Sequence, residues 1–193
     1  MKKSVSSELT ELARRLTEVE EVHRLRESLR AGGMASVDGV RAGAVALLAA
    51  SMASNRGTLV LVVADRSGAR ATLNDLRLFM EPDARLAWLP PWDRVPEFSR
   101  SLSDTTSGER LRVFQSLSSS EPPAILVAPI EAFLQPIPDR NELEQEVIRF
   151  VIGDTLEESR LLERLTSRGF VSQPAVEIPY EIAIRGGLID LSD

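Results

Sequence analysis

Apolar residues in the first thirty positions recur at spacings of three and four, which is the period of an α-helix. One helix is therefore predicted from residue 7 to residue 29, with a stripe formed by Leu9, Leu12, Leu16, Val19, Val22, Leu25 and Leu29. Because the stripe is narrow, we expect one face of this helix to pack against the body of the protein and the other to face water. Gly32 and Gly33 follow where the helix is expected to end.

The following hundred residues alternate between short apolar runs and segments of helical period. Strands are predicted at residues 34–38, 59–64, 86–88 and 124–128, and helices at residues 44–54, 67–80, 108–117 and 130–134. The run LVLVVA at 59–64 is rich in β-branched residues, which predicts a strand buried on both faces. This alternation predicts an α/β domain with a parallel sheet. Residues 89–108 have no regular period and contain several prolines, so a long loop is predicted there.

The pattern changes after residues 136–138, whose sequence is Pro-Ile-Pro. A strand is predicted at 147–152, a helix at 156–165 that ends at Arg168 and Gly169, and strands at 170–178 and 181–184. This order is typical of a small α+β unit. A domain boundary is therefore predicted near residues 135–140.

Composition narrows the classes of function. The 193 residues are 43% hydrophobic and 27% charged, which suits one globular domain and part of another. A net charge of −6 argues against a principal DNA-binding surface and favours a protein partner. The absence of cysteine excludes disulfides, thiolate metal sites and a cysteine nucleophile. With no signal peptide and no apolar run of membrane-spanning length, we predict a cytoplasmic protein that does not enter a membrane.

A degenerate phosphate loop lies between a predicted strand and a predicted helix, where a P-loop of pattern GxxxxGK[ST] belongs. Aligned from Gly39, and with Gly43 inside the loop, the required lysine is replaced by Val45 and the required Ser/Thr by Ala46. The lysine would neutralise the β- and γ-phosphates and the hydroxyl would hold Mg²⁺. On these residues alone, an ordinary strand–turn–helix is favoured over a nucleotide-binding loop, so no cofactor and no catalytic residue are predicted in this chain.

Other candidate residues favour structural roles. His23 is the single histidine and is expected to be a solvated helix residue. Glutamates at 142, 144 and 146 alternate and are expected to form a solvated strand edge. Trp88 and Trp92 flank two prolines, and we expect packing and loop anchoring there rather than stacking on a base. No metal-ligand spacing and no Ser–His–Asp grouping is present.

Three further segments complete a pattern of four. Residues 89–96 read LPPWDRVP and are followed by a Ser-rich loop and the pair Arg110-Leu111; residues 124–135 read AILVAPIEAFLQ; residues 169–191 end in YEIAIRGGLIDL. In this order they resemble bacterial transcription-repair coupling factors, the Mfd family. The last segment is similar to a signature that Mfd proteins share with UvrB. The lost phosphate-loop residues and a short, tyrosine-free 89–110 region favour Mfd over UvrB.

The resemblance implies an architecture and a function. Residues 1–33 would be an N-terminal helical segment, 34–138 a RecA-like domain with a vestigial nucleotide site, 139–185 an inserted α+β domain that binds UvrA, and 186–193 the start of a strand returning to the first domain. The chain would be a non-catalytic docking module for UvrA in transcription-coupled nucleotide excision repair. The parent would be an ATP-dependent DNA translocase that displaces stalled RNA polymerase, with ATP and magnesium in a motor outside this chain.

The same resemblance points to partner-binding residues. The arginines through which UvrB contacts UvrA fall at Ser172, Ala183 and Arg185 of this chain, so only Arg185 remains, and Arg168 is a candidate substitute. Arginine suits such a contact because its fork binds carboxylates through two donors. Gly186 and Gly187 are expected to form a backbone bend or bulge. Two alternatives stay open: a divergent UvrB-like nucleotide-binding or helicase domain, and a RecA-like scaffold that has lost UvrA binding.

Overall fold

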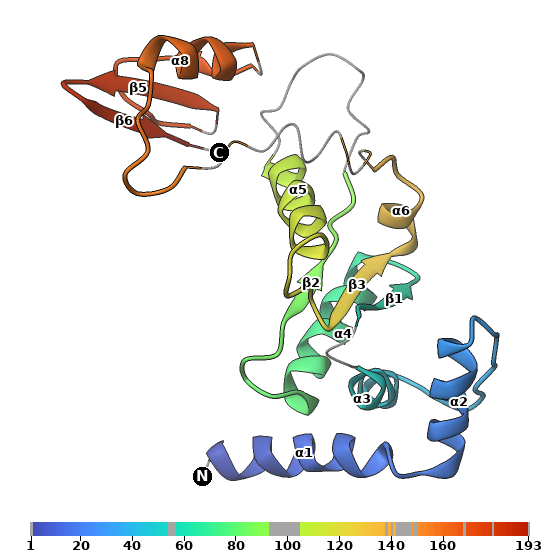
Figure 1. Cartoon of the computed structure of the whole chain (residues 1–193). Helices are drawn as coiled ribbons and strands as arrows, with labels where there is room; N and C mark the ends of the chain where they lie inside the picture. The colour runs from blue at the N-terminus through green and yellow to red at the C-terminus, as the bar shows by residue number, and fades with distance from the viewer. Residues whose placement is uncertain are drawn as a thin grey trace. The chain divides into compact units, whose positions relative to one another are not determined.

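The structure of this chain, a computed structural model, describes residues 2–53, 57–92, 105–137, 139, 141, 148, 150–167, 169–178 and 180–192 (Figure 1). The chain divides into two units. The first comprises Met1–Pro91 and Val113–Leu134, and the second Trp92–Arg112 and Gln135–Asp193. Arg168, the glutamates at 142, 144 and 146, and most of the predicted 89–108 loop lie outside the described residues.

A three-stranded parallel sheet organises the first unit. Its strands are β1 (Leu59–Val63), β2 (Leu86–Trp88) and β3 (Ile125–Pro129), in the order β1–β3–β2. Helix α4 (Arg66–Phe79) follows β1, and helix α5 (Thr105–Leu117) precedes β3. All three strands lie within one or two residues of their predicted positions. The prediction of an α/β unit with a parallel sheet is therefore confirmed.

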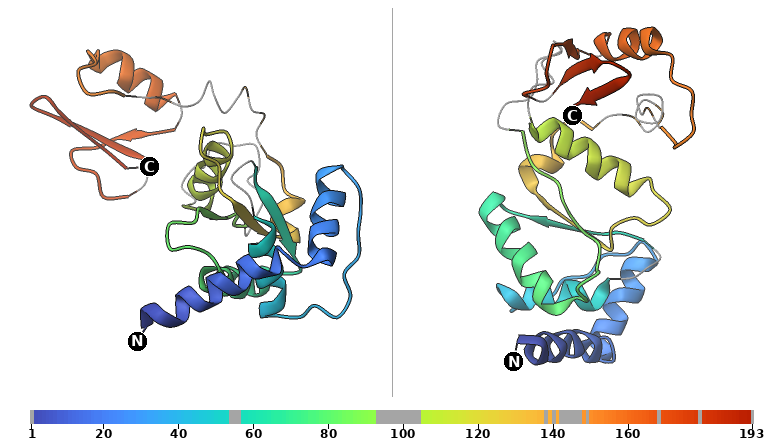
Figure 2. Two further views of the ribbon diagram at one scale, coloured as in Figure 1. Left: turned by 60° about the horizontal axis from the view of Figure 1, so that its bottom comes forward. Right: turned by 90° about the vertical axis from the view of Figure 1, so that its left-hand side faces the viewer.

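Helices lie on both faces of the sheet (Figure 2), and each face carries a separate core. On one face, α4 and α3 (Gly43–Met52) pack against the sheet through Ala46, Ala49, Ala69, Leu73, Leu76, Ile125 and Val127. On the other face, α5 and the short α6 (Ile130–Phe133) contribute to a core formed by Leu89, Val113, Leu126, Ala128 and Ala132. Because side chains alternate along a strand, β3 supplies both cores and is buried along its whole length.

Strand β1 is not buried on both faces, so that part of its prediction is wrong. Val60 is 44% exposed and Val62 is 40% exposed, whereas Leu59, Leu61 and Val63 pack against the core that α3 and α4 cover. The physical reason is position, because β1 lies at the edge of the sheet and the core beneath α5 is centred on β3. A continuous apolar run predicts two-sided burial only for a central strand.

The N-terminal region contains two helices rather than the single one predicted. Helix α1 (Lys2–Leu16) and helix α2 (Glu20–Arg30) run in clearly different directions (Figures 1 and 2). The Thr17 hydroxyl donates to the Arg14 carbonyl at 2.6 Å, and Val19 takes an extended conformation that ends the helical path.

The strand predicted at 34–38 is also wrong. Those residues are exposed and form no strand, with Met34 96% exposed. Among the residues that the structure describes, no strand lies beside this short run, which contains one β-branched residue.

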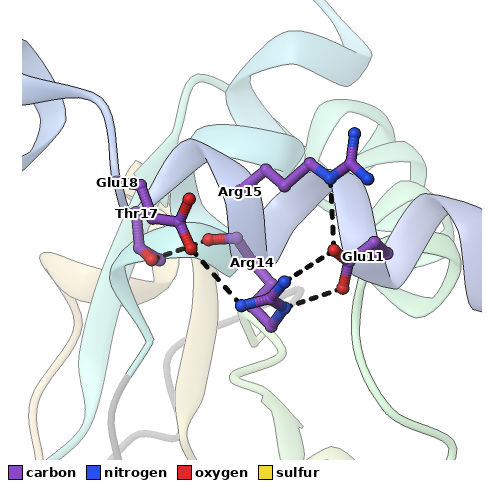
Figure 3. A network of polar contacts seen from close by, with 5 residues as sticks. All are labelled: Glu11, Arg14, Arg15, Thr17 and Glu18. Carbon is purple, nitrogen blue, oxygen red and sulfur yellow. Dashed lines mark hydrogen bonds and ion pairs between the residues drawn. The ribbon is translucent and has the colours of Figure 1, made fainter.

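Charged side chains on the exposed side of α1 form a network around Glu11 (Figure 3). Arg14 donates from Nε and Nη2 to the two Glu11 carboxylate oxygens, each at 2.7 Å, and Arg15 Nε donates to Glu11 Oε1 at 3.2 Å. Arg14 Nη1 also donates to Glu18 Oε1 at 3.4 Å. The two hydrogen bonds from Arg14, and then the one from Arg15, lower the pKa of Glu11 from 4.5 to about 2.

The second unit contains another three-stranded sheet. Strand β4 (Val171–Ser172) pairs parallel with β5 (Glu181–Arg185), and β5 pairs antiparallel with β6 (Leu188–Leu191). Helix α8 (Glu158–Thr166) covers one face, where its leucines pack with Ile182, Ile184 and Ile189. The helix predicted at 156–165 and the strand predicted at 181–184 are confirmed.

Two details of the second unit differ from the sequence analysis. Only Val171–Ser172 of the strand predicted at 170–178 pairs with another strand. Residues 150–152, which are the described end of the strand predicted at 147–152, are exposed and do not form a strand. Residues 188–191 pair with β5, and the assignment of residues 186–193 to a strand returning to the first domain stays a prediction. The domain boundaries near 33, 138 and 185 stay predictions.

The first unit should depend strongly on Leu76, which is fully buried between α4 and the sheet. Leu76→Ala should lower the free energy of unfolding by about 2–5 kcal/mol because it leaves a cavity in the core. Leu78→Ala is the matched control on the same helix, since Leu78 is 50% exposed, and should cost about 0.5 kcal/mol. Urea denaturation followed by circular dichroism measures both. Equal losses for the two variants would contradict this core.

The Glu11 network predicts an unusual titration. The carboxylate signal of Glu11 in a carbon-13 NMR titration should have its midpoint near pH 2. Any stabilisation of the folded state by the network is therefore fully present above pH 4.5, the ordinary pKa of a glutamate, and is lost as the pH falls towards 2. Arg14→Ala should raise the pKa of Glu11 more than Arg15→Ala, because Arg14 makes the larger contribution. A midpoint near 4.5 in the unsubstituted protein would contradict the network.

Candidate docking surface and vestigial phosphate loop

The loop that resembles a P-loop enters helix α3 without a preceding strand. Gly39 has a φ of +79° and Ala42 a φ of +45°, and Gly43 is the first residue of α3. Val45 is half-buried, and Ala46 is fully buried in the core beneath α3 and α4. The side chain at the position of the magnesium-binding hydroxyl therefore serves helix packing.

A carboxylate lies beside this helix N-terminus, which the sequence analysis did not foresee. Asp75 Oδ2 of α4 is 3.7 Å from the point that a Cβ on Gly43 would occupy. The positive end of a helix attracts anions, and here a carboxylate of the protein itself stands near it. With no cation at position 45 to offset the charge of Asp75, the arrangement disfavours a bound phosphate.

The hairpin that contains Arg185 has a fixed register. Gly186 and Gly187 have φ values of +55° and +85°, which makes them the two central residues of a tight hairpin turn. The expected backbone bend is therefore a turn. Arg185 lies opposite Leu188, and Ala183 lies opposite Asp190. Residues opposite each other in a ladder share one face of the sheet.

Two faces of the small sheet follow from this register. One face packs against α8. The other face, here called the docking face, consists of Val171, Glu181, Ala183, Arg185, Leu188 and Asp190. Val171 is 53% exposed and Leu188 is 70% exposed. The docking face therefore offers apolar and charged side chains to solvent.

The predicted partner-binding residues are only partly brought together. Ser172 lies beside Ile182 in the β4–β5 ladder, so it belongs to the face opposite the docking face. Ala183 is on the docking face but fully buried, so it offers no surface to a partner. Arg185 is exposed on the docking face. Arg168 lies outside the described residues. Of the four candidates, Arg185 alone combines a place on this face with exposure among the residues that the structure describes.

Arg185 forms an ion pair within the hairpin. Its Nη2 donates to Asp190 Oδ2 at 2.6 Å, and the two side chains are 60% and 50% exposed. Glu181, on the same face, accepts hydrogen bonds from the backbone N–H groups of Glu177 and Ile178. The one arginine of the docking face is thus held by a neighbouring carboxylate, and the glutamate is held by its own loop.

The second unit contains a buried polar cluster that the sequence analysis did not predict. Arg110 of α5 is 1% exposed, and its guanidinium carbon lies 4.2 Å from the centre of the Trp92 ring. Its Nη1 donates to Gln135 Oε1 and its Nη2 to the Pro136 carbonyl, each at 3.2 Å. Burial lowers the pKa of the Arg110 guanidinium, and the ring and the two oxygens compensate for part of the lost water.

Trp92 is the second anchor of this cluster. Its backbone N–H donates to Gln135 Oε1 at 2.8 Å, its carbonyl accepts from Gln135 Nε2 at 3.1 Å, and its indole Nε1 donates to Ser107 Oγ at 3.0 Å. The expected anchoring role of Trp92 is therefore confirmed. Trp92 and Arg110 belong to one of the segments that carry the family resemblance and Gln135 to the next, and this resemblance was the signal available in the sequence.

Two negative findings apply to the described part of the chain. No group of three or more histidines, cysteines, aspartates and glutamates there could hold a metal ion. No helix among those residues has the length and apolar character needed to cross a bilayer. His23 is an exposed residue of α2, as expected.

Comparison with known proteins gives relatives of one kind. No family model matches the chain. It is 28% identical to the transcription-repair-coupling factor of Bacillus subtilis (strain 168) over 123 residues, which are 64% of this chain and 10% of that protein. It is also 28% identical to the transcription-repair-coupling factor of Mycobacterium tuberculosis (strain CDC 1551 / Oshkosh) over 151 residues, or 75% of this chain and 12% of that protein. The resemblance inferred from the motifs is confirmed, and the chain spans about a tenth of these relatives.

The buried cluster predicts that Arg110 cannot be replaced by lysine. Arg110→Lys should lower the free energy of unfolding by about 2 kcal/mol, because a single ammonium cannot reach both oxygens while lying flat on Trp92. The matched control is Arg160→Lys on α8, an exposed arginine of the same unit. Guanidinium denaturation followed by tryptophan fluorescence measures both, and equal midpoints for the two variants would contradict the proposed importance of the cluster.

Proposed function

We propose that this chain is the N-terminal, UvrA-docking module of a transcription-repair coupling factor and takes no catalytic part itself. The observation that carries the proposal is the position of Arg185. This arginine stands where the family resemblance locates a UvrA contact, and it is exposed on an open sheet face of the second unit. The relatives support a coupling factor, and the motif order supports its N-terminal module.

The chemistry of the docking face suits a carboxylate of the partner. The Arg185 guanidinium offers five N–H donors, and its ion pair with Asp190 uses Nη2. A carboxylate on UvrA would bind through two of these donors. Leu188 lies opposite Arg185 and is 70% exposed, so an apolar side chain of the partner would fit beside the ion pair.

The first unit has, in this proposal, the role of a scaffold. Val45 and Ala46 replace the two residues that bind phosphate and magnesium, and Asp75 brings a negative charge to the α3 N-terminus. These features support a RecA-like domain whose nucleotide site is vestigial. ATP, magnesium, DNA and RNA polymerase would be bound elsewhere in a longer protein, and the net charge of −6 supports a protein partner for this part. The site of action would be the cytoplasm.

Binding to UvrA tests the proposal directly. The chain should bind purified UvrA from the organism that encodes it with a dissociation constant of micromolar order, and Arg185→Ala should weaken binding about tenfold, or roughly 1.4 kcal/mol. Arg160→Ala on α8 is the matched control and should leave the affinity unchanged. Isothermal titration calorimetry gives all three values. If the unsubstituted chain shows no binding at high micromolar concentration, the docking function is wrong and a scaffold without this partner is left.

A further inference from the structure

We propose that Asp190 competes with a binding partner for Arg185, so that the docking face binds only partners whose carboxylate displaces Asp190 from Arg185. This inference rests on the proposed docking function and adds a residue that sets its selectivity. Arg185 and Asp190 are the two opposite charges that meet on the docking face, at 2.6 Å. A module that must bind a carboxylate thus already contains one in contact with its arginine.

The contact is imposed by the backbone rather than by a chance side-chain conformation. Arg185 pairs with Leu188 and Ala183 pairs with Asp190, so Arg185 and Asp190 are diagonal neighbours on one face. Diagonal positions in an antiparallel ladder are within reach of a long side chain. The two-glycine turn fixes this register, and a slip of one residue would move Asp190 to the face that packs against α8. Whenever the hairpin is folded, Asp190 is therefore available to Arg185.

The ion pair is of a kind that a partner can displace. Both side chains are at least half exposed, and exposed ion pairs are weak because water and salt screen them. Only Nη2 of Arg185 contacts Asp190. A partner carboxylate that binds through two adjacent donors gains a second hydrogen bond that Asp190 does not make. A single backbone carbonyl on a partner gains no such advantage, so the competitor discriminates in favour of carboxylates.

The other carboxylate of the docking face does not share this role. Glu181 accepts hydrogen bonds from the backbone N–H groups of Glu177 and Ile178 at 2.8 and 3.1 Å, and those bonds hold its side chain to the loop before β5. Asp190 is the carboxylate whose charge bears on Arg185. Removing that charge should make the docking face more positive, which speeds association with an acidic surface.

The experiment compares the full chain with Asp190→Asn, Arg185→Ala and the double variant in binding to purified UvrA at one fixed salt concentration. Asp190→Asn should tighten binding about threefold to tenfold, because the amide keeps the shape of the side chain but not its charge. In the Arg185→Ala background the same substitution should have no effect, which shows that Asp190 acts through Arg185. Glu163→Gln on α8 removes one negative charge from the same unit and should change the affinity less than about twofold.

Several results would contradict the proposal that Asp190 competes for Arg185. Unchanged or weaker binding by Asp190→Asn would do so, and so would an equal gain from Glu163→Gln, which would reveal a general effect of net charge. A partner-free readout separates this proposal from the docking function. The NMR signals of the Arg185 Nη–H groups in the free chain should shift in Asp190→Asn, and unshifted signals would overturn the ion pair itself. A shifted signal with no UvrA binding by any of the proteins would overturn the docking function and, with it, the competition.

Discussion

The central strand β3 sets the constraint on which the first unit depends. Its residues are buried on both faces, and alternate side chains enter two different cores. Ile125 and Val127 meet α3 and α4, whereas Leu126 and Ala128 meet the residues of α5 and α6. Each helical layer covers its own core, and because β3 contributes to both, a displacement of β3 would disturb both cores. The small residues of α3 follow from the same constraint, since Ala46 and Ala49 let that helix approach α4 closely.

Local patterns in the sequence were sufficient to predict the elements whose secondary structure does not depend on distant parts of the chain. The runs at 59–64, 86–88 and 124–128 became strands, because β-branched and aromatic residues suit a buried pleated surface wherever it lies. Predictions failed where the outcome depends on distant parts of the chain. The exposure of Val60 follows from which strand is central, and residues 34–38 have no strand beside them in the described part of the chain. The helix break at residues 17–19, where the Thr17 hydroxyl donates to the Arg14 carbonyl, leaves the hydrophobic stripe unaltered.

The candidate site shows the same division. Motif resemblance identified Arg185, and the structure leaves that residue exposed. The resemblance could not show that Ser172 lies on the sheet face opposite the docking face, because the face of a residue depends on the register between strands that are distant in sequence. The partnership of Arg185 with Asp190 and the enclosure of Arg110 by Trp92, Gln135 and Pro136 were hidden for the same reason. A buried guanidinium is costly unless it is paired or hydrogen-bonded, so the positions of Trp92, Arg110 and Gln135 constrain one another.

The exposed edge of β1 has a consequence for handling this chain in solution. An edge strand presents unpaired backbone groups, and here Val60 and Val62 add an apolar surface on one face. Proteins usually protect such an edge with lysine, proline or a bulge, and LVLVV contains none of these. The run also has the β-propensity and the lack of charge that favour self-association through backbone pairing. The chain expressed by itself is therefore expected to lose solubility at high concentration, and a charged residue at position 60 or 62 would counter this without entering either core.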